Sequence, residues 1–87
     1  MATVFIPALL RKLTAGRDSM IASGGSVAQI IDDIERQFPG FRVQLVENGE
    51  LKPGIAVSVD GEIAVGGLLE PVAESSKIHF LPALGGG

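Results

Sequence analysis

The chain ends with the sequence FLPALGGG, from Phe80 to Gly87, and its last three residues are glycines. Because glycine has no Cβ atom, such residues can pass through a narrow channel and adopt backbone conformations that other residues avoid. Pro82 fixes its own φ angle and biases Leu81 away from helix, so the segment before the glycines is predicted to be extended. From Leu81 onward this segment spans roughly 20 Å, at about 3.3–3.6 Å per residue. It could deliver the carboxylate of Gly87 into the active site of another protein.

The residues alone leave two interpretations of this tail open. Either it is an idle end, frayed or left over from cloning, or its carboxylate is the functional group. Other chemistry is scarce, because the chain has no cysteine and a single histidine, His79. The lack of cysteine excludes disulfides, thiolate metal ligands and cysteine nucleophiles, and one histidine gives neither a metal cluster nor a choice of catalytic bases. We therefore expect no catalytic residue, bound cofactor or metal site, and a protein that is not an enzyme by itself.

Three further features favour a structural interpretation over a functional one. Residues 24–26 (GGS) precede a predicted helix, where anions bind, but they lack the lysine of a phosphate-binding loop, and the turn into the helix needs glycines anyway. The acidic residues Asp32, Asp33 and Glu35 do not converge on one ion, so a solvated helix face is predicted. His79 is predicted to lie on the outer face of the last strand, as a surface residue that a docking partner could contact.

The length of 87 residues suits one small domain, which we place at residues 1–87 with a flexible tail at 83–87. Hydrophobic residues make up 46% of the chain and charged residues 20%, which indicates a folded protein. The net charge of −3 and the lack of a basic cluster argue against a nucleic-acid partner. No apolar run approaches the roughly 20 residues that span a bilayer, and the N-terminus does not have the pattern of a signal peptide. We expect no membrane association and a cytoplasmic location.

The first quarter of the chain is predicted to form a hairpin. Residues 3–7 (TVFIP) are rich in β-branched and aromatic side chains, and residues 18–23 (DSMIAS) give a weaker strand pattern. Between them we expect a basic, partly exposed connection with a turn near Ala15-Gly16. A helix follows, because Ser26 and Gln29 have the spacing of a capping box and Pro39-Gly40 ends the pattern. Its apolar stripe has helical spacing and consists of Val27, Ile30, Ile31, Ile34 and Phe38.

The second half contains two hairpin signals, Asn48-Gly49 and Asp60-Gly61, because both central residues of a type I′ turn need positive φ angles. They fall within FRVQLVENGEL and GIAVSVDGEIAV, where we expect strands. Residues 66–75 are predicted to form a loop or short helical turn, and residues 77–82 (KIHFLP) the last strand. One amphipathic helix on a mixed sheet is an α+β fold, and this order of elements suggests the β-grasp, or ubiquitin-like, arrangement. There the first and last strands are central and parallel, so the tail would leave the sheet at a firmly anchored point.

Several segments also match a known family: RKLTAG at 11–16, the capped helix SVAQIIDDIERQFPG, ENGEL at 47–51, VSVDGE at 57–62, GGL at 66–68 and the tail IHFLPALGGG. With these the chain resembles the MoaD/ThiS family of ubiquitin-like sulfur carriers, and within it the CysO type that serves cysteine biosynthesis. The resemblance covers essentially the whole chain, although the tail is its one specific motif. The terminal diglycine of the family falls on Gly86-Gly87, and Gly85 takes a variable small position.

The resemblance implies a function. A partner enzyme would adenylate Gly87 with ATP and magnesium, and a sulfur donor would then displace AMP and leave a C-terminal thiocarboxylate. The sulfur would pass into biosynthesis, with cysteine as the first choice and molybdopterin, thiamine or a secondary metabolite as alternatives. The implied partners are an adenylating enzyme of the ubiquitin-activating type, a sulfur-accepting synthase resembling cysteine synthase, and a metalloprotease. Docking is expected on the outer sheet face and through Phe80, Leu81 and Leu84.

Two other functions compete with the carrier. The chain could be a protein modifier that is attached through Gly87 to lysines of other proteins, because the activation chemistry is shared. It could also be a non-catalytic adaptor of ubiquitin-like fold whose tail is idle. The sequence does not separate these, and the resemblance favours the sulfur carrier.

Overall fold

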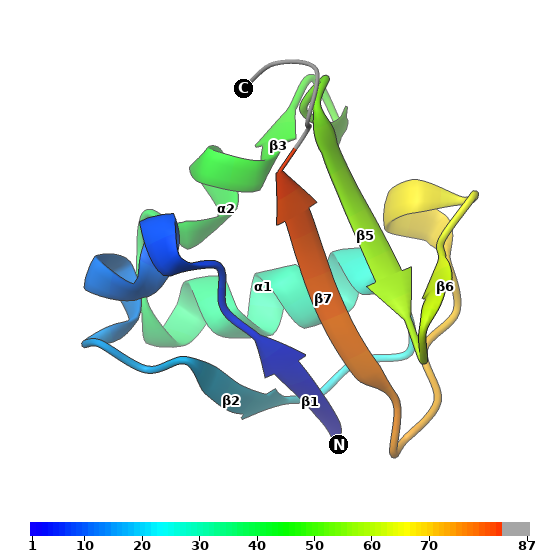
Figure 1. Ribbon diagram of the computed structural model, residues 1–87, viewed down its shortest axis with the longest axis horizontal. Helices are drawn as coiled ribbons and strands as arrows, with labels where there is room; N and C mark the ends of the chain where they lie inside the picture. Colours follow the sequence, from blue (N-terminus) through cyan, green and yellow to red (C-terminus); the bar gives the residue numbers. More distant parts are fainter. Residues whose placement is uncertain (83–87) are drawn as a thin grey trace.

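An amphipathic helix lies across one face of a mixed sheet, as the apolar stripe between Val27 and Phe38 predicted (Figure 1). The computed structural model describes residues 1–82. Its elements are β1 (Ala2–Phe5), η1 (Ala8–Thr14), β2 (Ser19–Ala22), α1 (Val27–Gln37), α2 (Phe41–Leu45), β3 (Val46–Glu47), β4 (Glu50–Leu51), β5 (Ile55–Val59), β6 (Glu62–Ile63), η2 (Gly67–Leu69) and β7 (Lys77–Pro82). The elements η1 and η2 are 3-10 helices. In this part of the chain, no helix has the length and apolar character to cross a membrane.

The first and last strands are central in the sheet. Within residues 1–82 the strand order is β2-β1-β7-β5-β6. β1 and β7 run parallel with Val4 opposite Ile78, and the other neighbours are antiparallel. The predicted hairpin between β1 and β2 and the predicted β-grasp fold are both confirmed.

The core lies between the sheet and α1. Ile30, Ile31 and Ile34 of the helix are fully buried, and so are Val4 and Ile78 of the two central strands. Burial of one such side chain stabilises a fold by about 1.5–3 kcal/mol relative to leaving it in water. These five residues therefore fix α1 against the middle of the sheet, where β7 runs.

The N-terminus of α1 has the predicted cap. The N–H of Gln29 donates to Ser26 Oγ at 3.3 Å, and Gln29 Oε1 accepts from the N–H of Gly25 at 2.7 Å. At Gly24, which has a φ of +155°, an added Cβ atom would lie 2.7 Å from the Cβ atom of Gln29. The N–H of Val27 donates to the Glu70 carbonyl. The close approach of the backbone to Gln29 explains why residue 24 is a glycine. This supports the structural interpretation of residues 24–26.

The segment after Pro39 differs from the prediction. Residues 41–45, expected to begin a strand, form the short helix α2, which buries Phe41 and Leu45. Glu35 of α1 caps it from outside, because its carboxylate accepts hydrogen bonds from the N–H groups of Gly40 at 3.1 Å and Arg42 at 2.7 Å. Free N–H groups at a helix start need such acceptors. The same contacts, the Arg42 N–H foremost, lower the pKa of Glu35.

The acidic face of α1 is more than a solvated surface. Asp33 accepts a hydrogen bond from the Ser23 N–H at 2.8 Å and pairs with Arg36 at 2.9 Å, and the Ser23 contact is the main cause of its lowered pKa. Asp32 pairs with Arg42 of α2 at 3.1 Å. The carboxylates of α1 thereby connect the helix to the segments that enter and leave it.

Both predicted two-residue turns are present. Asn48 and Gly49 have φ angles of 55° and 78°, and Asp60 and Gly61 have 53° and 87°. The first turn joins β3 to β4, which form a separate small sheet, and the second joins β5 to β6. The loop predicted at 66–75 contains η2.

The connection between β1 and β2 is more ordered than predicted. It forms η1 before the expected turn, where Ala15 has a φ of 57°. Arg11 Nε donates to the Ile6 carbonyl oxygen at 3.1 Å. The buried Thr14 hydroxyl lies 3.2 Å from the carbonyl oxygens of both Arg11 and Arg17. These contacts hold η1 against the end of β1.

Candidate functional site at the end of strand β7

Strand β7 begins at a cluster of hydrogen bonds around Asp60, the Asp60 cluster. The Oδ1 atom of Asp60 accepts from the Lys77 N–H at 2.9 Å, and the Oδ2 atom accepts from the Ser76 hydroxyl at 2.9 Å. The N–H of Asp60 donates to the Lys77 carbonyl oxygen at 2.8 Å. The Lys77 N–H, followed by the Ser76 hydroxyl, lowers the pKa of Asp60. The start of β7 is thereby tied to the turn between β5 and β6.

Further along, β7 has neighbours on both sides but not over its whole length. It pairs with β1 from Lys77 to His79 and with β5 from Ile78 to Pro82. In the described part of the chain, its last three residues therefore pair with β5 alone. The chain leaves the sheet at Pro82, opposite Ile55 and from the end of a central strand.

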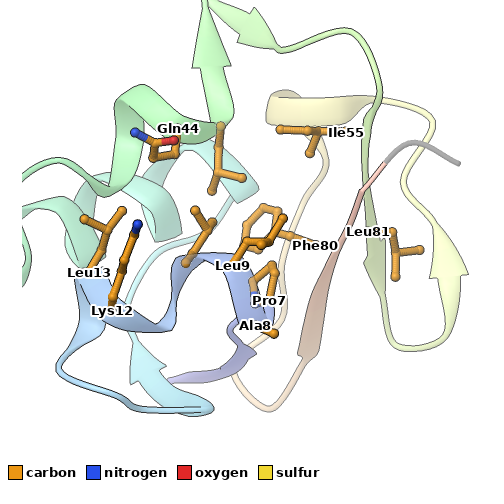
Figure 2. Close-up of a pocket in the computed structure, with 11 residues that line it drawn as sticks. Pro7, Ala8, Leu9, Lys12, Leu13, Gln44, Ile55, Phe80 and Leu81 are labelled. Atoms are coloured by element: carbon orange, nitrogen blue, oxygen red, sulfur yellow. The ribbon is translucent and has the colours of Figure 1, made fainter. Parts of the chain in front are cut away.

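An apolar groove lies beside this point, and we call it the exit groove (Figure 2). Its volume is about 580 Å³, and its lining includes Leu9 and Leu13 of η1, Gln44 of α2, Ile55 of β5 and Leu81 of β7. Leu9 is 80% exposed and Leu81 is 40% exposed. Apolar surface is thus open to solvent where the chain leaves the sheet.

The sequence predicts that Phe80 contacts a partner, but in the structure its side chain lies in the core. The side chain is 4% exposed and packs edge-on against Phe41, with 6.4 Å between the ring centroids. Side chains alternate across a strand, so Phe80 points into the core with Ile78 while Leu81 faces outward. Phe80 still contributes to the lining of the exit groove, and the docking role of Leu81 stays a prediction.

His79 lies on the outer face of the sheet, as predicted, and is exposed. Its ring stacks on Phe5 of β1, with centroids 4.3 Å apart and an angle of 5° between the planes. Leu81 follows two residues later on the same face. A stacked pair of rings therefore lies next to the exit groove on the outer face, and contact between His79 and a partner stays a prediction.

The four remaining site residues, Leu84, Gly85, Gly86 and Gly87, lie outside the described residues, as does the predicted tail at 83–87. Their roles stay predictions. Within residues 1–82, no three His, Cys, Asp or Glu side chains are grouped closely enough to hold a metal ion.

Two parts of this site were missed by the sequence analysis. Asp60 was identified as a turn residue, but its partner Ser76 is 16 residues away in the chain, and nothing local indicates that contact. The sequence gives a weak indication that η1 contributes to the exit groove, because Leu9 and Leu10 follow Pro7 outside any strand pattern. Adjacent leucines in a supposed loop indicate either burial or an exposed apolar surface.

Comparisons with known proteins cover the whole chain. The ThiS family model matches residues 4–87. The sulfur carrier protein CysO of Mycobacterium bovis is 33% identical over 90 residues, which cover 98% of this chain and 97% of that protein. A chain in the crystal structure of the Amycolatopsis orientalis BexX/CysO complex has a TM-score of 0.93 and 38% identity, covering 100% of both chains. The crystal structure of Mycobacterium tuberculosis CysO has a TM-score of 0.92 and 31% identity, covering 97% of this chain and 100% of that one.

Proposed function

The chain belongs to the ThiS family, and from this we propose that it is a sulfur carrier whose Gly87 carboxylate takes up the sulfur atom. The observation that carries the proposal is that the family match continues to residue 87, so it includes the terminal diglycine. The fold supports it, because the central strand β7 ends at Pro82, five residues before that carboxylate.

The carboxylate has to be activated first, because a carboxylate is a poor electrophile. We infer that a partner enzyme uses ATP and Mg²⁺ to join the Gly87 carboxylate to AMP, with release of pyrophosphate. A donor of sulfide-level sulfur, hydrosulfide in the simplest case, then attacks the carbonyl carbon, so that a C–S bond forms, the C–O bond to AMP breaks, AMP leaves with the electron pair, and the S–H proton is lost to solvent. The product is a thiocarboxylate at the C-terminus, which carries the sulfur without any cysteine in the chain.

The role of the described residues in this scheme is to position the tail. The Asp60 cluster and the pairing with β1 and β5 fix β7, so the chain leaves the sheet at a constant place. A fixed origin reduces the range of positions that the carboxylate must search before it reacts. The exposed Leu81, beside the exit groove, is the contact through which a partner would hold the base of the tail.

Partner enzymes follow from the same scheme. The similar chain of known structure comes from a complex of CysO with BexX, which supports docking of this chain on a partner. We propose two partners, an adenylating enzyme and a sulfur-accepting synthase. Both are proposed to act with this chain in the cytoplasm. Cysteine biosynthesis is the preferred destination of the sulfur, because the similar carriers are CysO proteins, and molybdopterin, thiamine and secondary-metabolite routes are the alternatives.

The test is the intact mass of the chain after incubation with the adenylating enzyme, ATP and a sulfur donor. We expect a species in which one oxygen is exchanged for sulfur. Deletion of Gly87 should abolish this species and leave the melting temperature unchanged, whereas Gly85→Ala, at the variable position, should still be loaded.

Two outcomes would overturn the proposal. If an active enzyme adenylates the chain and no thiocarboxylate forms, while isopeptide-linked conjugates of Gly87 accumulate in cells, the chain is a protein modifier. If the chain that lacks its tail restores full activity in cells, the tail is idle and the chain is an adaptor.

A further inference from the structure

A second apolar surface, separate from the exit groove, lies around η2. Val65 is 96% exposed and Leu69 is 84% exposed, the two highest exposed fractions among the large hydrophobic residues of the described chain. With Leu51 of β4 and Leu68 of η2 they line a hollow of about 470 Å³, and we call this surface the η2 patch. Grouped apolar side chains that extend this far into water mark an interaction site.

The η2 patch and the exit groove cannot meet within one molecule. Among the described residues, none lines both surfaces. Figure 1 shows η1, which lines the groove, at the left of the view and η2 at the right, with β7 between them. The segment around η2 is tied to the entry of α1, because the N–H of Val27 donates to the Glu70 carbonyl oxygen and the N–H of Val72 donates to the Gly25 carbonyl oxygen, both at 3.0 Å. A contact between the two surfaces therefore has to join two molecules.

The two surfaces have opposite charges at their edges. Lys12 is the only charged residue in the described lining of the exit groove, and Glu50 holds that position in the described lining of the η2 patch. Arg11 is the other charged residue of η1. Residues 53–76, which contain η2, include four acidic residues and no basic one. Lys52 precedes this stretch and does not line the hollow. One molecule thus presents an apolar surface with a positive edge and another with a negative edge.

We propose that the η2 patch of one copy of the chain binds the exit groove of a second copy. Leu69 of the first copy enters the groove beside Leu9 of the second, and the carboxylate of Glu50 faces the ammonium group of Lys12. Removal of the leucine side chains from water drives the contact, and the unlike charges select its orientation. Because two different surfaces meet, each pair keeps one free groove and one free patch, which extend the assembly or close it into a ring.

The association is weak and reversible. It depends on a few side chains of each copy, whereas a stable complex uses about 20–30 residues on each side. A bound copy covers Leu9 and Leu81, where a partner enzyme is proposed to dock, so self-association would compete with loading of the tail. This consequence rests on the proposed function, but the contact itself does not.

The test is sedimentation equilibrium of the full chain from about 10 μM to about 1 mM. We expect the weight-average mass to rise with concentration. Leu9→Ser in the groove and Leu69→Ser in the patch should each require a roughly tenfold higher concentration for the same mass, because each removes a buried leucine from the contact. Val43→Ser is the matched control, because Val43 is 61% exposed on α2 and lines neither surface. It should associate like the unchanged chain.

A mixture of the two leucine variants tests whether unlike surfaces meet. The Leu9→Ser chain keeps its η2 patch, and the Leu69→Ser chain keeps its exit groove. At a concentration where neither variant associates alone, an equal mixture should therefore form pairs. These pairs should not grow further, because the groove and the patch that remain free are the altered ones.

A charge exchange tests the pairing of Lys12 with Glu50. Lys12→Glu and Glu50→Lys should each weaken association by roughly threefold, and a chain that carries both substitutions should recover it. Added salt should weaken association of the unchanged chain, because it screens exposed charges. If the double variant is as weak as either single one, Glu50 does not face Lys12.

Three results would overturn the inference. A monomer at every concentration would leave the η2 patch to a different protein. Association that Leu69→Ser abolishes and Leu9→Ser leaves unchanged would show that the patch binds the same patch of another copy. A mixture of the leucine variants that stays monomeric would exclude a contact between patch and groove. No experiment here uses ATP, sulfur or an enzyme, so failure of the sulfur-carrier proposal leaves the results standing.

Discussion

The two ends of strand β7 are held by different kinds of contact. At the first end, the carboxylate of Asp60 binds the N–H of Lys77 and the hydroxyl of the buried Ser76. At the second end, Leu81 and Pro82 pair with β5 alone among the described strands, and an apolar groove lies beside them. Directional hydrogen bonds fix a position, whereas an open apolar surface can be covered by different molecules. The strand therefore combines a fixed origin with an end that is free to take a partner.

The largest effect on stability is expected at Phe80, which lies between the two ends of β7 and whose ring faces the core. Phe80→Ala removes a buried aromatic side chain and its edge-on contact with Phe41, so we expect a loss of about 3–5 kcal/mol in the free energy of unfolding. Urea or thermal unfolding measures this. Phe5→Ala is the matched control, because its half-buried ring stacks on His79 on the outer face and should cost about 1–2 kcal/mol. Equal losses in the two variants would contradict the placement of Phe80 in the core.

An intermediate effect is expected from the carboxylates that accept hydrogen bonds from the backbone, among them Asp60 at the first end of β7, as a dependence of stability on pH. The pKa values of Asp33, Glu35 and Asp60 are all lowered in the fold, mainly by backbone N–H groups. A carboxylate with a lowered pKa stabilises the fold above its ordinary pKa, and this stabilisation is lost as the pH falls through the folded-state value. We expect a level melting temperature above about pH 5, and a fall as the pH passes below 4.5 and 3.8, the ordinary values for Glu and Asp.

The variant Asp60→Asn assigns part of this dependence to the Asp60 cluster. It should lower the melting temperature at neutral pH and make the fall in acid shallower, because one of the three carboxylates is gone. Glu62→Gln, in the same hairpin, is the control that should leave the pH profile unchanged. Coinciding profiles for the two variants would show that the Asp60 cluster does not hold the start of β7.

The smallest effect on stability is expected at Leu81, near the second end of β7, beside the exit groove. Leu81→Ser alters a side chain that is 40% exposed, so the free energy of unfolding should fall by about 1 kcal/mol or less. Loading of the tail by the adenylating enzyme should slow, because Leu81 is the proposed contact of the partner. A large loss of stability without any change in loading would show that Leu81 belongs to the core and not to a docking surface.

Much of the fold was predictable because its signals are local. The spacing of Ile30, Ile31 and Ile34 predicted α1, and the Asp60-Gly61 turn predicted the hairpin of β5 and β6. Alternation along 77–82 placed His79 on the outer face of the last strand. Each signal depends on a few neighbouring residues and on the geometry of a single element.

The segment at 41–45 shows why other parts were not predictable. Phe41 and Val43 have side chains that favour a strand, so the sequence predicts a strand here. In the structure, Glu35 supplies the acceptor that the first N–H groups of α2 need, and Phe41 and Leu45 enter the core together. Contacts from α1 outweigh local preference, which is worth less than 1 kcal/mol per residue for ordinary residues.

The α+β class, the capped helix, the turns and the family could be predicted from the sequence, because they depend on local spacing and on a terminal motif. Only the folded arrangement shows that Asp60 holds the first end of β7 and that η1, α2 and β5 line a groove at the other end. Those features depend on residues that are distant in the chain, such as Leu9, Gln44 and Ile55, and only folding brings them together. The sequence thus predicted a function for the tail, and the fold set the surface beside which the chain leaves the sheet.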